Sequence, residues 1–168
     1  MKKVFGLSFM LVFILAACAP AAVSSEPIVS QNGIEVSDPW VRAAAMKEGM
    51  GEGMQDDNQG DMHGGAVTGA FMLIKNTGNQ EDMLISANSD VAMDVQIHET
   101  TMTDGVMSMS EVPGVKIPAD GAAELKPGGY HVMLIGLKQE LKEGDTVTIV
   151  LTFQNAGDIS LEVPVKMP

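Results

Sequence analysis

The feature that most constrains this chain is an alternation of apolar and polar residues with a period of two, which runs from Ile34 almost to the C-terminus. Successive side chains of a β-strand point to opposite faces of a sheet, so this alternation predicts strands with one buried face. No stretch of the sequence carries a long helical period, and no internal repeat is apparent. Many short strands at close spacing indicate an all-β sandwich or barrel.

The predicted strands are separated by short stretches of Gly, Pro, Asn and Asp, which favour turns. Examples of these stretches are Asn76-Thr77-Gly78, Asp104-Gly105 and Pro127-Gly128-Gly129. The large aromatic residues Trp40, Phe71 and Phe153 are expected in the hydrophobic core. The predicted strands span residues 34–36, 40–44, 67–75, 82–87, 91–100, 106–112, 122–125, 130–137, 146–154 and 159–165.

The N-terminus predicts export and lipid attachment. A basic start is followed by an apolar run over residues 4–15, shorter than the about 20 residues that a membrane-spanning helix needs. The run ends in Leu15-Ala16-Ala17-Cys18, which resembles a bacterial lipobox. Residues 1–17 are then a lipoprotein signal peptide, and Cys18 is the lipidated residue. An ordinary cleaved signal peptide with a chance cysteine is the alternative.

The rest of the chain is expected to form a tether and one domain. Residues 18–33 are rich in Pro and Ser and are predicted to link the lipid to a β-domain over residues 34–168. The expected location is the bacterial cell envelope, with the domain facing the periplasm or the cell exterior. The formal net charge of −12 argues against a nucleic-acid partner and against binding to anionic lipid head groups.

One internal segment breaks the strand pattern. Residues 46–65, MKEGMGEGMQDDNQGDMHGG, are rich in Gly and acidic residues and lack a core-forming period, which is typical of a long loop. Methionine has little packing to contribute in a solvated loop, so a metal-gathering role and a merely solvated loop are both considered. The candidate auxiliary ligands in this insert are Met46, Met50, Met54, Met62 and His63.

The sequence around Asp104-Gly105 predicts a β-hairpin. If these two residues form the turn, Met102 faces Met107 and Thr100 faces Met109. His98 then lies diagonal to Met109 on the same face, at about 7–8 Å. An imidazole and a thioether could therefore reach one ion between them. The predicted members of this face are His98, Thr100, Met102, Met107 and Met109.

A second pair of this kind occurs in the strand over residues 130–137. His131 and Met133 are two residues apart and share a face, with Cα atoms about 6.6 Å apart. Thioether sulfur suits Cu(I), whereas Mg(II), Ca(II) and Mn(II) prefer oxygen ligands and Zn(II) usually takes Cys, His or carboxylate. A blue-copper site needs a thiolate, and the only cysteine is Cys18. A structural role for each Met and His is the alternative.

Taken together, the two pairs read His98-x10-Met109-x21-His131-x-Met133. This spacing resembles the signature of the PCu(A)C-type periplasmic copper chaperones. The surrounding sequence IHETTMTDGVMSMSEVPGVKIPADGAAELKPGGYHVMLIGLK and the upstream segments VSDPWVRAA and GAFMLIKNTG also resemble this family. The resemblance covers most of the chain after residue 33.

The resemblance implies a cupredoxin-like Greek-key β-sandwich or barrel that binds one Cu(I) through His98, Met109, His131 and Met133. It also implies copper delivery for respiratory oxidase assembly, notably at the CuA centre of cytochrome c oxidase. The chain departs from the family pattern at Glu99, where some members have Met, and in the length of the insert over residues 46–65. It also reaches Pro168 without the Met/His-rich tail of some members, so the insert is a candidate auxiliary segment, with a merely solvated loop as the alternative.

We therefore expect a lipid-anchored Cu(I) carrier rather than an enzyme. Its expected partner is a copper-accepting protein, either an oxidase subunit or another thiol-containing copper protein. Copper storage or detoxification through the insert is the principal alternative. A copper enzyme or electron carrier, and a structural lipoprotein whose methionines fill the core, are further alternatives. Hydrolase and NTPase functions have no support, because the sequence contains no GxSxG element, Walker loop or HExxH helix.

Overall fold

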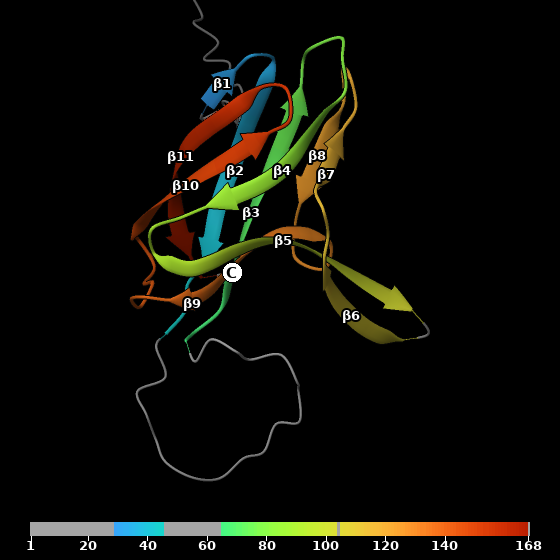
Figure 1. Ribbon diagram of the computed structural model, residues 1–168. Coiled ribbons are helices and arrows are strands. Elements are labelled where there is room, and N and C mark those ends of the chain that lie inside the picture. Colours follow the sequence, from blue (N-terminus) through green and yellow to red (C-terminus); the bar gives the residue numbers. More distant parts are fainter. Residues whose placement is uncertain (1–28, 46–64, 104, 168) are drawn as a thin grey trace, which may run out of the picture.

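A computed structural model describes residues 29–45, 65–103 and 105–167 of the chain. Every regular element in these ranges is a β-strand, so the all-β prediction is confirmed (Figure 1). The strands are β1 (Val29–Gln31), β2 (Ile34–Arg42), β3 (Thr68–Asn76), β4 (Asp82–Asn88), β5 (Ala92–Thr103), β6 (Val106–Glu111), β7 (Val115–Ile117), β8 (Ala122–Leu125), β9 (Tyr130–Leu137), β10 (Thr146–Phe153) and β11 (Gly157–Lys166).

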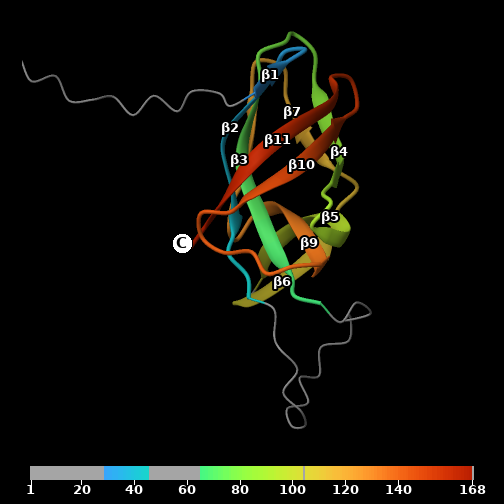
Figure 2. The ribbon, with the colours of Figure 1, turned by 90° about the vertical axis from the view of Figure 1, so that its left-hand side faces the viewer.

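The strands form one mixed sheet that folds over on itself. Their order is β6-β5-β9-β8-β3-β2-β11-β10-β4-β7, with β1 added beside β2 and a further pairing between β9 and β3. The β10–β11 hairpin and β4 lie over the layer that contains β2 and β3 (Figures 1 and 2). Strand β11 joins the two layers by pairing in parallel with the end of β2. The result is a β-sandwich with a barrel-like outline.

The hydrophobic core lies between these two layers. It is formed by the apolar residues that alternate with polar ones along the strands. In β10 every second side chain is buried, and Ile149 faces Leu161 of β11 across the ladder. Full burial of one such aliphatic side chain contributes about 1.5–3 kcal/mol. The fully buried set includes Ile34, Ile74, Leu84, Ile117, Leu125, Leu134, Leu137, Leu141, Ile149, Leu151, Phe153 and Ile159.

Strand β2 differs from the sequence prediction, which placed two strands over residues 34–36 and 40–44. The structure has a single strand whose register with β3 shifts between Ser37 and Trp40. Asp38 has a φ of 49° at this point. Pro39 follows it and has no N–H to give to a ladder, so the pair produces a bulge rather than the end of the strand.

Strands β1 and β7 were not predicted. Val29–Gln31 pairs with β2 through an Asn32-Gly33 turn, in which both residues have positive φ values of 49° and 86°. This is the hairpin turn that Asn-Gly favours. The expected tether over residues 18–33 was therefore too long at its C-terminal end, because residues 29–33 belong to the domain.

Strand β5 is long enough to serve two partners. Its first part pairs with β9, and its last part pairs with β6, which has no other neighbour among the described strands. The end of β5 and β6 together project from the body as a two-stranded arm, here defined as residues 99–103 and 105–111 (Figure 1). The pairs Thr100–Met109, Met102–Met107 and Thr103–Val106 face each other, which confirms the predicted hairpin register.

Several predictions concern residues outside the described ranges. These are the signal peptide, Cys18, the tether up to residue 28, and the auxiliary ligands Met46, Met50, Met54, Met62 and His63. Within the described ranges, no helix has the length and apolar character needed to cross a membrane.

Candidate metal centre

The four predicted ligands come from three neighbouring strands. His98 of β5 lies directly opposite His131 of β9, and the centroids of the two rings are 5.9 Å apart. Met133 of β9 lies opposite Gln96, on the same face as both histidines. Met109 of β6 lies opposite Thr100, diagonal to His98. The topology therefore brings two imidazoles and two thioethers to one side of the sheet, where the arm begins.

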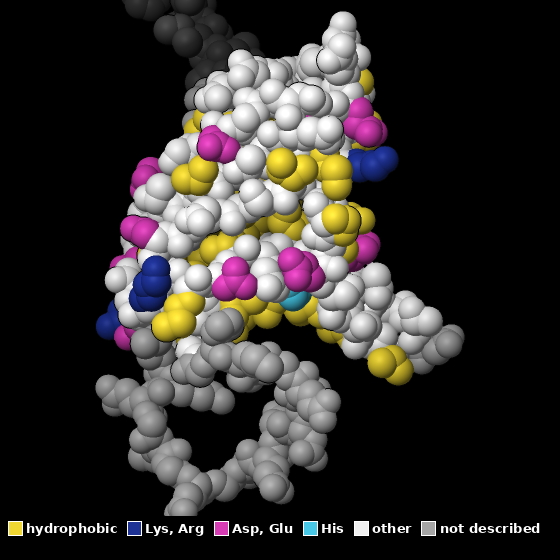
Figure 3. Space-filling model, viewed as in Figure 1, with side chains coloured by type: hydrophobic (Ala, Val, Ile, Leu, Met, Phe, Trp, Pro, Cys, Tyr) yellow, Lys and Arg dark blue, Asp and Glu magenta, His cyan; other side chains and the backbone are white. Residues whose placement is uncertain are grey.

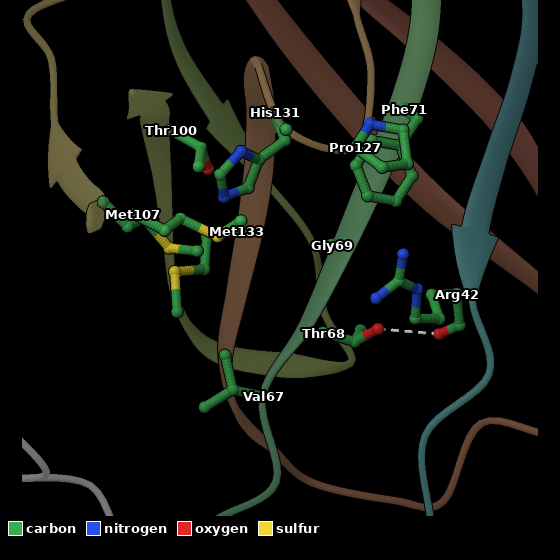
Figure 4. Close-up of a pocket in the computed structure, with 12 residues that line it drawn as sticks. Arg42, Val67, Thr68, Gly69, Phe71, Thr100, Met107, Pro127, His131 and Met133 are labelled. Atoms are coloured by element: carbon green, nitrogen blue, oxygen red, sulfur yellow. Dashed lines mark hydrogen bonds between the residues drawn. The ribbon is translucent and has the colours of Figure 1, made fainter. Parts of the chain in front are cut away.

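Three of the four residues line one pocket of about 330 Å³. Met107 approaches it from the arm, and His131 and Met133 approach it from β9 (Figure 4). Met109, which also belongs to the arm, completes this part of the lining. His98 is not part of this lining but lies beside it, next to the His131 ring. In Figure 3 a histidine surface is visible in the hollow between the body and the arm, with hydrophobic side chains around it.

A tight turn positions His131. The backbone of Gly129 donates to the carbonyl of Lys126 at 3.0 Å, and Lys126 donates to the carbonyl of Tyr130 at 2.8 Å. Gly128 has a φ of 81°, which glycine adopts without strain. The His131 Nδ1 atom lies 3.0 Å from the Gly129 carbonyl oxygen. Because a carbonyl only accepts, Nδ1 carries the proton, and the neutral ring keeps its lone pair on Nε2.

A chain of hydrogen bonds along β5 orients His98. The Gln96 amide nitrogen donates to the Asp94 carboxylate at 2.9 Å, so the amide oxygen faces the other way. This oxygen lies 2.7 Å from His98 Nε2 and accepts its proton. The lone pair of His98 is therefore on Nδ1, which is buried and has no hydrogen-bond partner among the residues that the structure describes. Since buried polar atoms are nearly always paired, this nitrogen fits the role of a metal ligand.

The environment of His98 favours its neutral form. Burial lowers the pKa of His98 below 6.5, and the charge of the neighbouring His131 lowers this pKa further. Glu111, which faces His98 across β5 and β6, opposes both effects. A neutral imidazole is the form that binds a metal ion. The site therefore keeps one of its nitrogen donors available at pH values where a free histidine begins to take up a proton.

Aromatic packing forms the wall of the pocket on the body side. The Trp40 and Phe71 rings are 4.5 Å apart, and Phe71 is 6.3 Å from His131. The Arg42 guanidinium carbon lies 5.7 Å from the centre of the Phe71 ring. A side chain on Gly69, which faces Met133, would approach the Phe71 ring to 3.0 Å. Phe71 therefore both fills the core edge and shapes the pocket.

The donor set fits a soft monovalent metal ion. Across residues 29–45, 65–103 and 105–167, no three His, Cys, Asp or Glu side chains converge in a way that could hold a metal ion. A typical zinc or calcium site is thus not present there. Two imidazole nitrogens with two thioether sulfurs are instead ligands suited to Cu(I).

Two residues at this site were not predicted as functional. The predicted hairpin register put Met107 on the ligand face, but Met107 lines the pocket only because of the direction in which the arm leaves the body, which the sequence does not show. Gln96 orients His98, and its alternation with His98 along β5 was the only signal that could have found it.

Comparisons with known proteins identify the family to which the chain belongs. The family described as "Putative lipoprotein LpqE-like" matches residues 34–165. The chain belongs to this LpqE-like family. A relative in Leifsonia xyli subsp. xyli, "Putative lipoprotein Lxx21020", is 34% identical over 156 residues, which cover 90% of this chain and 82% of the relative. "Uncharacterized protein RP573" of Rickettsia prowazekii is 25% identical, with coverage of 79% of this chain and 66% of that protein.

Solved structures resemble this LpqE-like chain in fold. The "Copper-bound PCuAC domain from PmoF2" has a TM-score of 0.61 at 21% identity, with coverage of 83% of this chain and 97% of that domain. "CuI-DR1885 from Deinococcus Radiodurans" has a TM-score of 0.53 at 27% identity, with coverage of 87% and 83%. The predicted cupredoxin-like β-fold of the PCuAC type is thereby confirmed.

Proposed function

We propose that this LpqE-like chain is an envelope copper chaperone, in which His98, Met109, His131 and Met133 bind one Cu(I). The observation that carries this proposal is the pair of facing histidines. Hydrogen bonds leave one nitrogen lone pair on each ring without a partner among the described residues, and Met109 and Met133 occupy neighbouring register positions on the same face of the sheet.

The solved structures of similar fold support copper as the cargo. One is described as a copper-bound PCuAC domain, and another, 27% identical to this chain, as a Cu(I) form of its protein. The metal in those structures belongs to those proteins. For this chain the support is the matching fold together with a neutral nitrogen and sulfur donor set of its own.

The pocket has the properties of a site that releases its ion. Met109 is 50% exposed, so an acceptor can approach the metal from the arm side. Thioethers are neutral and weak donors, whereas thiolates bind soft metals more strongly. Transfer then proceeds by stepwise ligand exchange, in which each acceptor thiolate replaces one thioether or imidazole and copper remains Cu(I). The protein acts as a carrier rather than an enzyme.

The acceptor that fits this chemistry is a thiol-containing copper protein. By its resemblance to the PCu(A)C-type chaperones, we propose a respiratory oxidase subunit with a CuA centre as this acceptor. Lipidation at Cys18 would hold the carrier at the membrane surface, where the domain faces the periplasm or the cell exterior. The partners are thus a copper-accepting protein and the membrane, reached through the lipid anchor.

Copper storage is a second candidate, favoured by the methionines of the insert. The chain has 14 methionines, and Met46, Met50, Met54 and Met62 with His63 occur within the insert. A storage protein binds several Cu(I) ions per chain, whereas a carrier needs one. The copper stoichiometry therefore separates the two functions.

The test of the proposed function is an anaerobic competition titration against a chromophoric Cu(I) chelator. We expect one tightly held Cu(I) per chain, and the conservative change Met133→Leu should lower the affinity by at least tenfold. Met93→Leu alters an exposed methionine outside the pocket and serves as the matched control. Equal affinities in wild type, Met133→Leu and His131→Gln would overturn the assignment of the site.

A further inference from the structure

The arm carries two methionines that the four-ligand site does not use. Met102 of β5 and Met107 of β6 face each other near the tip of the arm, and they are 69% and 63% exposed. Met109 is the next residue of the same face toward the body. Sulfur side chains thus extend from the tip of the arm to the pocket that contains His131.

The backbone hydrogen bonds show how closely the facing methionines approach. Val112 donates to the Ile97 carbonyl of β5 at 2.9 Å, and Thr100 donates to the Gly129 carbonyl at 3.1 Å. The backbone groups of the odd-numbered residues of β5 therefore form hydrogen bonds with β6, and those of the even-numbered residues form hydrogen bonds with β9. Met102–Met107 is therefore a non-hydrogen-bonded pair, whose Cα atoms are only about 4.5 Å apart. Two thioethers on such a pair can reach one ion.

Met107 connects the tip to the pocket. It faces Met102 on one side, and it lines the pocket with Met109, His131 and Met133 on the other. In Figure 4 the Met107 and Met133 side chains converge on the same part of the pocket as the His131 ring. Met107 thus belongs both to the facing pair on the arm and to the pocket that contains the proposed ligands.

Packing alone does not account for these side chains. All six residues of β6 are exposed, and within the described part of the chain this strand pairs only with β5. Burial in such an arm is slight, and β-branched residues would suit an exposed strand better than methionine. What methionine offers and leucine lacks is a sulfur lone pair.

We propose that Met102 and Met107 form a second, outer Cu(I) site, with Met109 as a third ligand shared with the inner site. This inference rests on the proposed copper function and extends it to the arm. The outer site contains thioethers alone, so it binds Cu(I) more weakly than the inner site with its two imidazoles. An ion moves between the two sites when one thioether is exchanged for another, without change of oxidation state.

An outer site of this kind sets the path of the ion. Copper arrives and leaves at the most exposed end of the arm, where an acceptor has room to bind. The inner site holds the ion between these events. Loss of the Met102 thioether should therefore slow exchange in both directions while it leaves the inner affinity almost unchanged.

Ag(I), which has the same charge and closed d shell as Cu(I) and does not change oxidation state, tests this inference in the processed full chain. With ¹³C-labelled methionine methyl groups, each methionine reports its own ligation by NMR. We expect the Met133 signal to shift with the first equivalent of Ag(I), and the Met102 and Met107 signals to shift with further Ag(I). Unshifted Met102 and Met107 signals alongside a shifted Met133 signal would overturn the outer site alone. An unshifted Met133 signal would overturn the inner site instead.

The variant Met102→Leu, at a position outside the pocket lining, supplies a kinetic test, with Met93→Leu as its control. Leucine keeps the apolar volume, and circular dichroism checks that the β-fold remains. We expect the inner Cu(I) affinity to stay within about twofold of wild type, and the rate of Cu(I) transfer to a dithiol acceptor to fall at least fivefold. An unchanged transfer rate would contradict the proposal.

Discussion

His98 and His131 lie directly opposite each other on β5 and β9, with ring centroids 5.9 Å apart. Each ring is held by its own hydrogen bond, to Gln96 and to the Gly129 carbonyl respectively. The bonds involve different ring nitrogens, so the free lone pairs are on Nδ1 of His98 and Nε2 of His131. Nitrogen-15 NMR of the metal-free protein should show these two opposite tautomers.

The hydrogen-bond chain through Gln96 should tune the copper affinity. In Gln96→Leu, His98 loses the acceptor that fixes its tautomer, and Asp94 loses its amide donor. Loss of such an outer partner typically costs 10–100-fold in metal affinity. We expect a decrease in this range by competition titration, together with mixed His98 tautomers by NMR. Gln139→Leu, at an exposed position, should leave both properties unchanged.

Protonation of His98 should weaken copper binding only below the pH at which a free histidine takes up its proton. Burial and the charge of His131 lower the pKa of His98 below 6.5, and Glu111 opposes this. In Glu111→Gln the pKa of His98 should fall further, so the variant should retain Cu(I) to a lower pH than wild type. Titration of copper release against pH measures the difference. Release at the same pH in both proteins would contradict the role given to Glu111.

The lowered pKa of His98 also predicts how the stability of the folded state depends on pH. Between the lowered pKa of folded His98 and the value of about 6.5 in the unfolded chain, the unfolded state binds more protons. The metal-free protein should therefore lose stability as the pH falls from 6.5 through the folded pKa of His98. His98→Gln should reduce this loss, as measured by urea unfolding at a series of pH values.

A buried carboxylate far from the pocket should matter for stability alone. Asp82 is 6% exposed and accepts hydrogen bonds from the backbone N–H groups of Met83, Asn155 and Ala156. Its removal in Asp82→Ala leaves buried donors unpaired, at a cost of about 1–3 kcal/mol for each. Chemical denaturation should show a loss of at least about 2 kcal/mol. The exposed Asp90→Ala should show little change, and the folded fraction of both variants should bind Cu(I) normally.

The strand pattern and the hairpin register were predictable because both depend on local sequence. The predicted bounds of β8 and β9 match the structure, and Met102 faces Met107 as the turn at Asp104-Gly105 required. Strand β1 was missed because its three residues are largely exposed and carry no alternation. In β2, Pro39 looked like a break, although tertiary pairing with β3 continues past it.

The composition of the site was predictable, but its arrangement was not. Spacing placed His131 and Met133 on one face, yet no local rule shows that β5 and β9 are neighbours or that His98 faces His131. The orientation of each ring depends on partners from the tertiary structure, such as the Gly129 carbonyl. The roles of Gln96 and Phe71 follow from the same long-range packing and appear only in three dimensions.

X-ray absorption at the copper edge counts the ligands of the bound ion, on the Cu(I) complex of the processed chain at one equivalent. We expect two nitrogen and two sulfur ligands, with the same sulfur count after removal of residues 46–65. Met109→Leu/Met133→Leu should remove the sulfur contribution. A copper ion ligated by nitrogen and oxygen alone, or sulfur ligands that disappear with the insert, would contradict the proposed four-ligand site.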